Sequence, residues 1–167
     1  MMLVVGDTSP IRALANLGLL GILSNLYSEV IVPPAVAAEL RDSPSGHASV
    51  EPERIAFLRV LPANDRAAVD EFRDDLDLGE SEALALALEI GADLVLIDEA
   101  KGRAKAAEVG LDIVGVIGIL LEAKEAGQVV ALRPLLDRLR DEFDFWISPR
   151  LRAHALDSAR ETSEGDE

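Results

Sequence analysis

The sequence has no cysteine and only two histidines, His47 and His154, among its 167 residues. The lack of cysteine excludes a disulfide framework, a thiolate metal site and a cysteine nucleophile, and it suits a reducing cytoplasm. Because imidazole is the other characteristic ligand of zinc, a zinc site is not expected either.

Positive charge is also scarce, since 16 Lys and Arg face 31 Asp and Glu and give a formal net charge of -15. Such a charge repels phosphate backbones at long range, so a nucleic-acid substrate would need local attraction. No apolar run reaches the roughly 18 residues of a membrane span, and the first residues lack the basic segment of a signal peptide. We therefore expect a soluble cytoplasmic protein with no membrane partner.

The chain has the length and apolar content of one ordinary domain, with 49% hydrophobic residues. We expect a single domain over residues 1–160 and an acidic, disordered tail over 161–167. Strand-like apolar runs alternate with stretches of helical period, which predicts βαβ units and an α/β fold with a mostly parallel sheet of about five strands. The strands are expected at 3–6, 29–32, 57–61, 94–97 and 113–116.

Helical periodicity fills most of the intervals between these strands, whereas residues 43–53 read as a surface loop. Residues 133–160 are also predicted to be helical, with a break near Pro149. Helices are expected to begin near Pro10, Pro33, Asn64, Gly79, Glu99 and Ile117. The predicted packing residues of the last stretch are Leu135, Leu136, Leu139, Phe143 and Trp146.

Two aspartates follow strand-like runs at the points where the chain turns into a helix. Asp7 follows the apolar residues 3–5, and Ser9 with Pro10 reads as a helix N-cap followed by proline at the first helical position. Asp98 ends the most strand-like run of the sequence. Ligands and catalytic groups gather at the carboxyl ends of parallel strands. An aspartate at such a turn also holds the turn through its own backbone, so both interpretations stay open.

Two glutamates lie on predicted helices. Glu39 stands at the border of the buried face of its helix, where Arg12 or Arg41 could pair with it. Glu80 opens its helix on the inward side, and we expect Glu82, two residues later, to be solvated. The helix dipole alone also favours acidic residues in a first turn.

These four carboxylates would together form a cleft of nearly pure oxygen ligands, which hard divalent cations such as Mg²⁺ and Mn²⁺ prefer. Without a cation, crowded carboxylates repel one another and raise one another's pKa. A bound metal ion would therefore keep all of them charged. The candidates are Asp7, Glu39, Glu80 and Asp98.

Four segments appear in the chain in a distinctive order, namely DTSP, VPPAVAAEL, LDLGESEALALALEIGADLVLIDEAKGRAKAAEVGL and VGVIGILLEAKEAG. Their order and spacing resemble the PIN-domain superfamily, and most closely a prokaryotic branch related to the VapC-type toxins of toxin–antitoxin pairs. The resemblance runs from Met2 to about Phe145. It implies a three-layer α/β/α fold around the parallel sheet.

The resemblance also implies an activity, that of a metal-dependent ribonuclease that uses Mg²⁺ or Mn²⁺ to hydrolyse RNA phosphodiester bonds and is blocked by a cognate antitoxin. The small hydroxyl residue of the family falls on Ser9, as a group near the ligands. This sequence departs from the commoner pattern by having Glu at position 80 and by having Glu99 after Asp98. The catalytic and metal-binding acids of the family fall on Asp7, Glu39, Glu80 and Asp98.

The sequence also indicates residues that could contact the substrate and partner proteins. The cations that closely follow Asp98 are candidates for contacting RNA phosphate, Arg103 foremost because its planar guanidinium can grip phosphate with two bonds. We expect a homodimer as well as an antitoxin partner, and the apolar carboxy-terminal part is a candidate surface for either. The cations are Lys101, Arg103 and Lys105, and the carboxy-terminal aromatic residues are Phe143, Phe145 and Trp146.

Two alternatives compete with the ribonuclease. In a phosphotransfer domain of the haloacid-dehalogenase or receiver type, a strand-end aspartate is the nucleophile, but a second acid beside the first is expected there and GDTSP has none. In a non-catalytic interaction module, the acidic cleft would no longer turn over substrate. Divalent-metal titration separates the module from the enzyme, and beryllofluoride binding separates the phosphotransfer domain.

Overall fold

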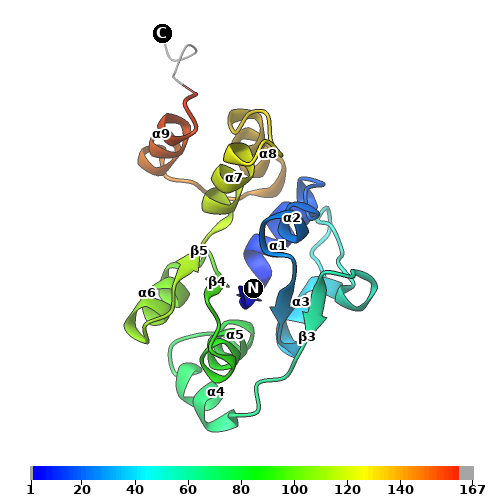
Figure 1. Cartoon of the computed structure of the whole chain (residues 1–167), viewed down its shortest axis with the longest axis vertical. Coiled ribbons are helices and arrows are strands. Elements are labelled where there is room, and N and C mark those ends of the chain that lie inside the picture. The colour runs from blue at the N-terminus through cyan, green and yellow to red at the C-terminus, as the bar shows by residue number, and fades with distance from the viewer. Residues whose placement is uncertain (1, 162–167) are drawn as a thin grey trace. The chain divides into compact units, whose positions relative to one another are not determined.

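The structure, a computed structural model, describes residues 2–161, and within them five strands form one sheet (Figure 1). The strands are β1 (Val4–Gly6), β2 (Val30–Val32), β3 (Leu58–Val60), β4 (Leu94–Leu96) and β5 (Ile113–Val114). Every neighbouring pair is parallel, and the order across the sheet is β3-β2-β1-β4-β5. The predicted α/β/α fold with a parallel five-stranded sheet is therefore confirmed.

The central strand is β1, which pairs with β2 on one side and with β4 on the other. In register, Val5 stands opposite Ile31 of β2 and Val95 of β4. All of these residues are buried, because helices cover both faces of the sheet, and this explains why the central strands read as apolar runs without alternation.

The helices occur in the intervals where helical periodicity predicted them. They are α1 (Thr8–Asn16), α2 (Ile22–Tyr27), α3 (Pro34–Arg41), α4 (Arg66–Phe72), α5 (Leu78–Ile90), α6 (Ala100–Glu108), α7 (Val116–Glu125), α8 (Arg133–Phe143) and α9 (Pro149–Ser158), with a short 3-10 helix at Pro52–Arg54. The break predicted near Pro149 separates α8 from α9, and the Ser148 hydroxyl accepts a hydrogen bond from the Leu151 amide there.

The start of the first helix differs from the prediction. Asp7, with an extended backbone, takes the N-cap position, and the helix begins at Thr8 rather than at Pro10. The Asp7 amide donates to the Leu96 carbonyl at 2.9 Å, so pairing with β4 continues up to Asp7 and the helix starts directly after it. Ser9 consequently lies inside the first turn of α1 and not at its cap.

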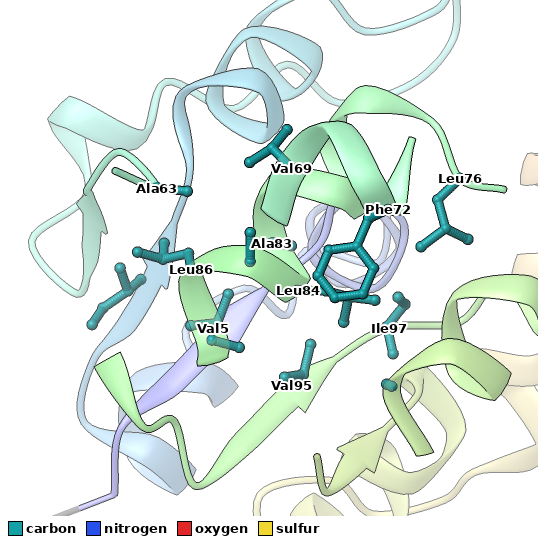
Figure 2. Close-up of a cluster of buried hydrophobic side chains, with 14 residues drawn as sticks. Val5, Ala63, Val69, Phe72, Leu76, Ala83, Leu84, Leu86, Val95 and Ile97 are labelled. Atoms are coloured by element: carbon teal, nitrogen blue, oxygen red, sulfur yellow. The ribbon is translucent and has the colours of Figure 1, made fainter. Parts of the chain in front are cut away.

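The core on one side of the sheet lies between the strands and helices α4 and α5 (Figure 2). Val5 and Val95 point from the strands toward Leu84 of α5, and Phe72 of α4 covers them. On the opposite side, a Cβ at Gly6 would come within 2.7 Å of Ile11 of α1, so α1 packs directly on β1 there. Helix α5 packs against α3, α4, β1 and β4, which explains why it is apolar nearly all round.

The chain divides into two compact units, Met1–Val116 and Ile117–Glu167. In the second unit Leu136 and Leu139 of α8 are buried as predicted, whereas Trp146, also predicted to pack, is 80% exposed. The Glu161 carboxylate accepts hydrogen bonds from the Leu132 and Arg133 amides at 2.6 and 3.0 Å. The rest of the predicted acidic tail lies outside the described residues.

Within residues 2–161, none of the helices combines the length and the apolar character that crossing a membrane requires.

Candidate active site

The order of the strands creates a switch point between β1 and β4. From β1 the chain moves outward through β2 to β3, whereas β4 and β5 lie on the other side of β1. The connections at the carboxyl ends of β1 and β4 therefore lead away from each other, and such a point is where open α/β sheets bind ligands. Asp7 directly follows β1, and Asp98 comes two residues after β4.

Asp7 is the most buried carboxylate of this region, with 4% of its surface exposed. Burial raises its pKa from 3.8 to about 7, although the Thr8 amide, which favours the charged form, opposes the rise. The nearby charges of Asp77, Glu39 and Glu99 are smaller causes of the same rise. Asp7 is therefore a carboxylate held among other carboxylates and shielded from water.

Glu80 lies in the first turn of α5 and is also buried. Burial is the main cause that raises its pKa from 4.5 to about 8, followed by the charges of Asp77 and Asp7. Asp77 is the N-cap of α5, and its Oδ1 accepts a hydrogen bond from the Glu80 amide at 2.8 Å. The sequence reasoning missed Asp77, although an aspartate directly before a predicted helix is a recognisable N-cap signal.

Glu39 lies near the end of α3 and is half-buried. Its Oε2 accepts a hydrogen bond from the Thr8 hydroxyl at 2.5 Å, so the hydroxyl that contacts this candidate ligand belongs to Thr8 and not to Ser9. Arg12 donates to the Glu39 backbone carbonyl, whereas Arg41 pairs with Glu53. The carboxylate of Glu39 is thus bound by a hydroxyl and not neutralised by either arginine.

Asp98 lies between β4 and α6, beside the start of α7. Its Oδ1 accepts a hydrogen bond from the Val116 amide at 3.1 Å. Burial raises its pKa from 3.8 to about 6, against the opposing effects of the Val116 amide and the Arg103 guanidinium. A Cβ at Gly115 would lie 2.4 Å from Asp98 Oδ1 and 2.9 Å from Arg103 Nη1, so the glycine leaves the space that both side chains use.

The cations expected to contact substrate differ in their surroundings. Arg103 is half-buried and its Nη1 donates to the Ile97 carbonyl at 3.2 Å, which fixes it beside Asp98. Lys105 pairs with Asp75 and Glu108 at 3.5 and 3.3 Å. Lys101 is exposed on α6. Glu99, the N-cap residue of α6, is also exposed, and its negative charge raises the pKa of Asp7, Glu80 and Asp98.

The prediction that Glu82 is solvated is wrong, because only 6% of the residue is exposed. Its Oε2 accepts a hydrogen bond from the Ala35 amide at 2.9 Å, and its Oε1 pairs with Arg66 at 3.2 Å. Pro33 and Pro34 have no amide hydrogen, so Ala35 carries the first free N–H at the start of α3. Glu82 thus supplies, from α5, the acceptor that α3 lacks at its own N-cap.

The structure therefore gathers three of the predicted acids, Asp7, Glu39 and Glu80, and adds Asp77 to them. Asp98 stands at the adjacent strand end, with Arg103 at its side. Within the described part of the chain, no three Asp, Glu, His or Cys side chains stand close enough to form a ready-made metal site. The arrangement is a group of carboxylates in which the pKa values of Asp7, Glu80 and Asp98 are raised, mainly because these side chains are buried.

Comparison with models of protein families gives one family. A family model described as a PIN domain matches residues 3–161, which is nearly the whole chain and reaches into both compact units. No curated protein gives a significant match. The matched region contains the parallel sheet, its switch point and every acidic residue discussed above. The chain belongs to the PIN-domain family.

Proposed function

We propose that this protein is a Mg²⁺- or Mn²⁺-dependent endoribonuclease that hydrolyses RNA phosphodiester bonds, and that it acts as the toxin of a toxin–antitoxin pair. The observation that carries the proposal is the cluster of buried carboxylates with raised pKa values at the switch point of a PIN-domain sheet. Perturbed carboxylates of this kind concentrate at functional sites.

The chemistry of the donor set fits a hard divalent cation. All donors are carboxylate oxygens, and burial together with repulsion from neighbouring carboxylates makes the charged forms of Asp7 and Glu80 costly. A divalent cation is the partner that would offset both costs, and the half-buried Glu39 is already oriented by the Thr8 hydroxyl. We assign the cation to four residues: Asp7, Glu39, Glu80 and Asp98.

The residues of the chain have separate parts in the reaction. When bound, the cation supplies Lewis acidity that lowers the pKa of a water molecule and orients it toward phosphorus. Asp7 and Glu80 would hold the cation as ionised carboxylates, because a neighbouring positive charge favours the ionised form over the protonated one. Arg103, fixed beside Asp98, contacts the substrate phosphate and offsets the repulsion from the acidic surface. Hydrolysis leaves a 5′-phosphate and a 3′-hydroxyl.

The test is RNA cleavage with Mn²⁺ by Asp98→Asn. The variant should cleave at least about 100-fold more slowly than the wild type, because it removes one ligand charge. The matched control is Asp112→Asn, which changes an exposed aspartate directly before β5, at the amino edge of the sheet. Full activity of Asp98→Asn, or an equal loss in the control, would contradict the assignment of Asp98.

A second candidate function is a PIN-like interaction module without catalysis. The observation that favours it is that the described side chains, as they stand, form no ready-made metal site. Calorimetric titration of the wild type with Mn²⁺ separates the two functions. The ribonuclease requires Mn²⁺ binding that depends on Asp7 and Asp98, whereas the interaction module does not. Membership of the PIN-domain family removes the grounds for the phosphotransfer alternative.

The toxin role has its own test, which does not depend on the chemistry of the site. Expression of the wild type should arrest growth, and Asp98→Asn should not. A gene beside that of a toxin should encode a small protein that binds this chain and restores growth when both are expressed. Normal growth during expression of a wild type that cleaves RNA in vitro would contradict the toxin role and leave the ribonuclease standing.

A further inference from the structure

Two residues outside its own helix define the position of the Glu39 carboxylate. The Thr8 hydroxyl donates a hydrogen bond to it, and Gly79, which has no side chain, leaves the space that its Oε1 occupies. We propose that Thr8 and Gly79 are positioning residues that fix the Glu39 carboxylate for the cation. This inference rests on the proposed function. Thr8 and Gly79 are not among the four predicted acidic ligands.

Thr8 is suited to orient a carboxylate because it is itself fixed. It is the first residue of α1 and only 5% exposed, and as a β-branched residue it has few side-chain rotamers available in a helix. Its Oγ1 donates to Glu39 Oε2 at 2.5 Å, and hydrogen bonds from hydroxyls to ionised carboxylates are short and strong. Thr8 directly follows Asp7, so the contact links Glu39 to the segment that carries Asp7.

Gly79 closes the other side of the carboxylate. A Cβ at this position would lie 2.6 Å from Glu39 Oε1 and 3.2 Å from its Cδ, so any side chain at position 79 would push the carboxylate away. Gly79 is in the first turn of α5 and directly precedes Glu80. The carboxylate of Glu39 therefore lies between the Thr8 hydroxyl and the space left at Gly79, and each of these two residues is next in sequence to another proposed ligand, Asp7 or Glu80.

The position of α3 does not depend on these two contacts. Arg12 donates to the Glu39 backbone carbonyl, and Glu82 accepts from the Ala35 amide at the start of the helix. Removal of the Thr8 hydroxyl therefore leaves α3 in place and releases only the carboxylate of Glu39. This separation predicts a loss of cation affinity without a matching loss of the fold.

The experiment compares Thr8→Val, Thr8→Ser and Gly79→Ala with the wild type in calorimetric titrations with Mn²⁺ alone, without RNA. Thr8→Val keeps the shape of the side chain and removes the hydroxyl, and it should weaken Mn²⁺ binding about 10-fold or more, as changes behind a ligand commonly do. Thr8→Ser keeps the hydroxyl and should restore most of the affinity. Gly79→Ala should weaken binding by displacing the carboxylate, although alanine is the better helix former.

Thermal unfolding without metal accompanies each titration, and Gly79→Ala should unfold at or above the wild-type temperature because its helix propensity improves. If Thr8→Val does not fold, Gly79→Ala alone decides. Wild-type affinity in both Thr8→Val and Gly79→Ala overturns the positioning role while the proposed function stands. A wild type that binds no Mn²⁺ overturns the proposed function and this inference together.

Discussion

Replacement of Asp7 by asparagine should stabilise the metal-free protein, and more so at higher pH. The pKa of Asp7 is raised in the folded state from 3.8 to about 7, mainly because the side chain is buried. The folded protein therefore holds a proton that the unfolded chain has already released. Stability consequently falls as pH rises from about 4 to about 7, and it levels off above that range.

The size of this effect follows from the pKa values. One pKa unit corresponds to about 1.4 kcal/mol, so ionised Asp7 lowers the free energy of unfolding by about 4 kcal/mol in total, of which about 2–3 kcal/mol is lost between pH 5 and pH 8. The buried amide of Asp7→Asn carries its own cost of about 1–3 kcal/mol, which does not vary with pH. The advantage of the variant over the wild type should thus grow by about 2–3 kcal/mol between the two pH values.

The assay is urea unfolding in the presence of a chelator at pH 5 and pH 8, followed by the same measurement with Mn²⁺. An ion that binds only the folded wild type stabilises it by about 2.7 kcal/mol at 100 times its Kd, so Mn²⁺ should reduce or reverse the advantage of Asp7→Asn. A stability difference that is the same at both pH values would refute the argument. It would mean that Asp7 is ionised in the folded protein, with a structural partner for its charge.

Two further predictions concern cations and the buried glutamate of α5. Arg103→Ala should weaken RNA binding in Mn²⁺ and flatten its dependence on salt while Mn²⁺ binding persists, because a phosphate contact contributes to the salt slope; identical binding curves would remove Arg103 from the substrate site. Glu82→Ala should lower the free energy of unfolding by about 1–3 kcal/mol, since the Ala35 amide loses its acceptor, and Glu82→Gln should lower it less. Equal losses in urea unfolding would show that the acceptor oxygen is not what matters.

The central part of the sheet could be predicted from the sequence because β1, β2 and β4 are largely buried. These strands appear as uninterrupted apolar runs that end at Gly, Pro or Asp. The strand ends then located Asp7 and Asp98 without any structural information. The order of the strands across the sheet required the structure, because β1 and β4 are neighbours although they are distant in sequence.

The surroundings of the acids were less predictable. Glu80 and Glu82 both lie at the start of a helix that is apolar nearly all round, so periodicity could not tell which of them meets solvent. The acceptor role of Glu82 depends on Ala35, on another helix, and on the two prolines before it. The contact of Thr8 with Glu39 depends on where α1 begins, and the sequence pattern placed that start two residues too late.

The pairing of β1 with β4 has a consequence for synthesis of the protein. β1 is made first, but one of its two neighbours in the sheet, β4, is completed only when Leu96 has been added. Contacts between distant parts of a chain also form late in folding, because a long loop must close before they can form. A nascent chain that ends before Asp98 thus lacks one of the proposed ligands. The proposed site can therefore be complete only after β4 and Asp98 have been synthesised.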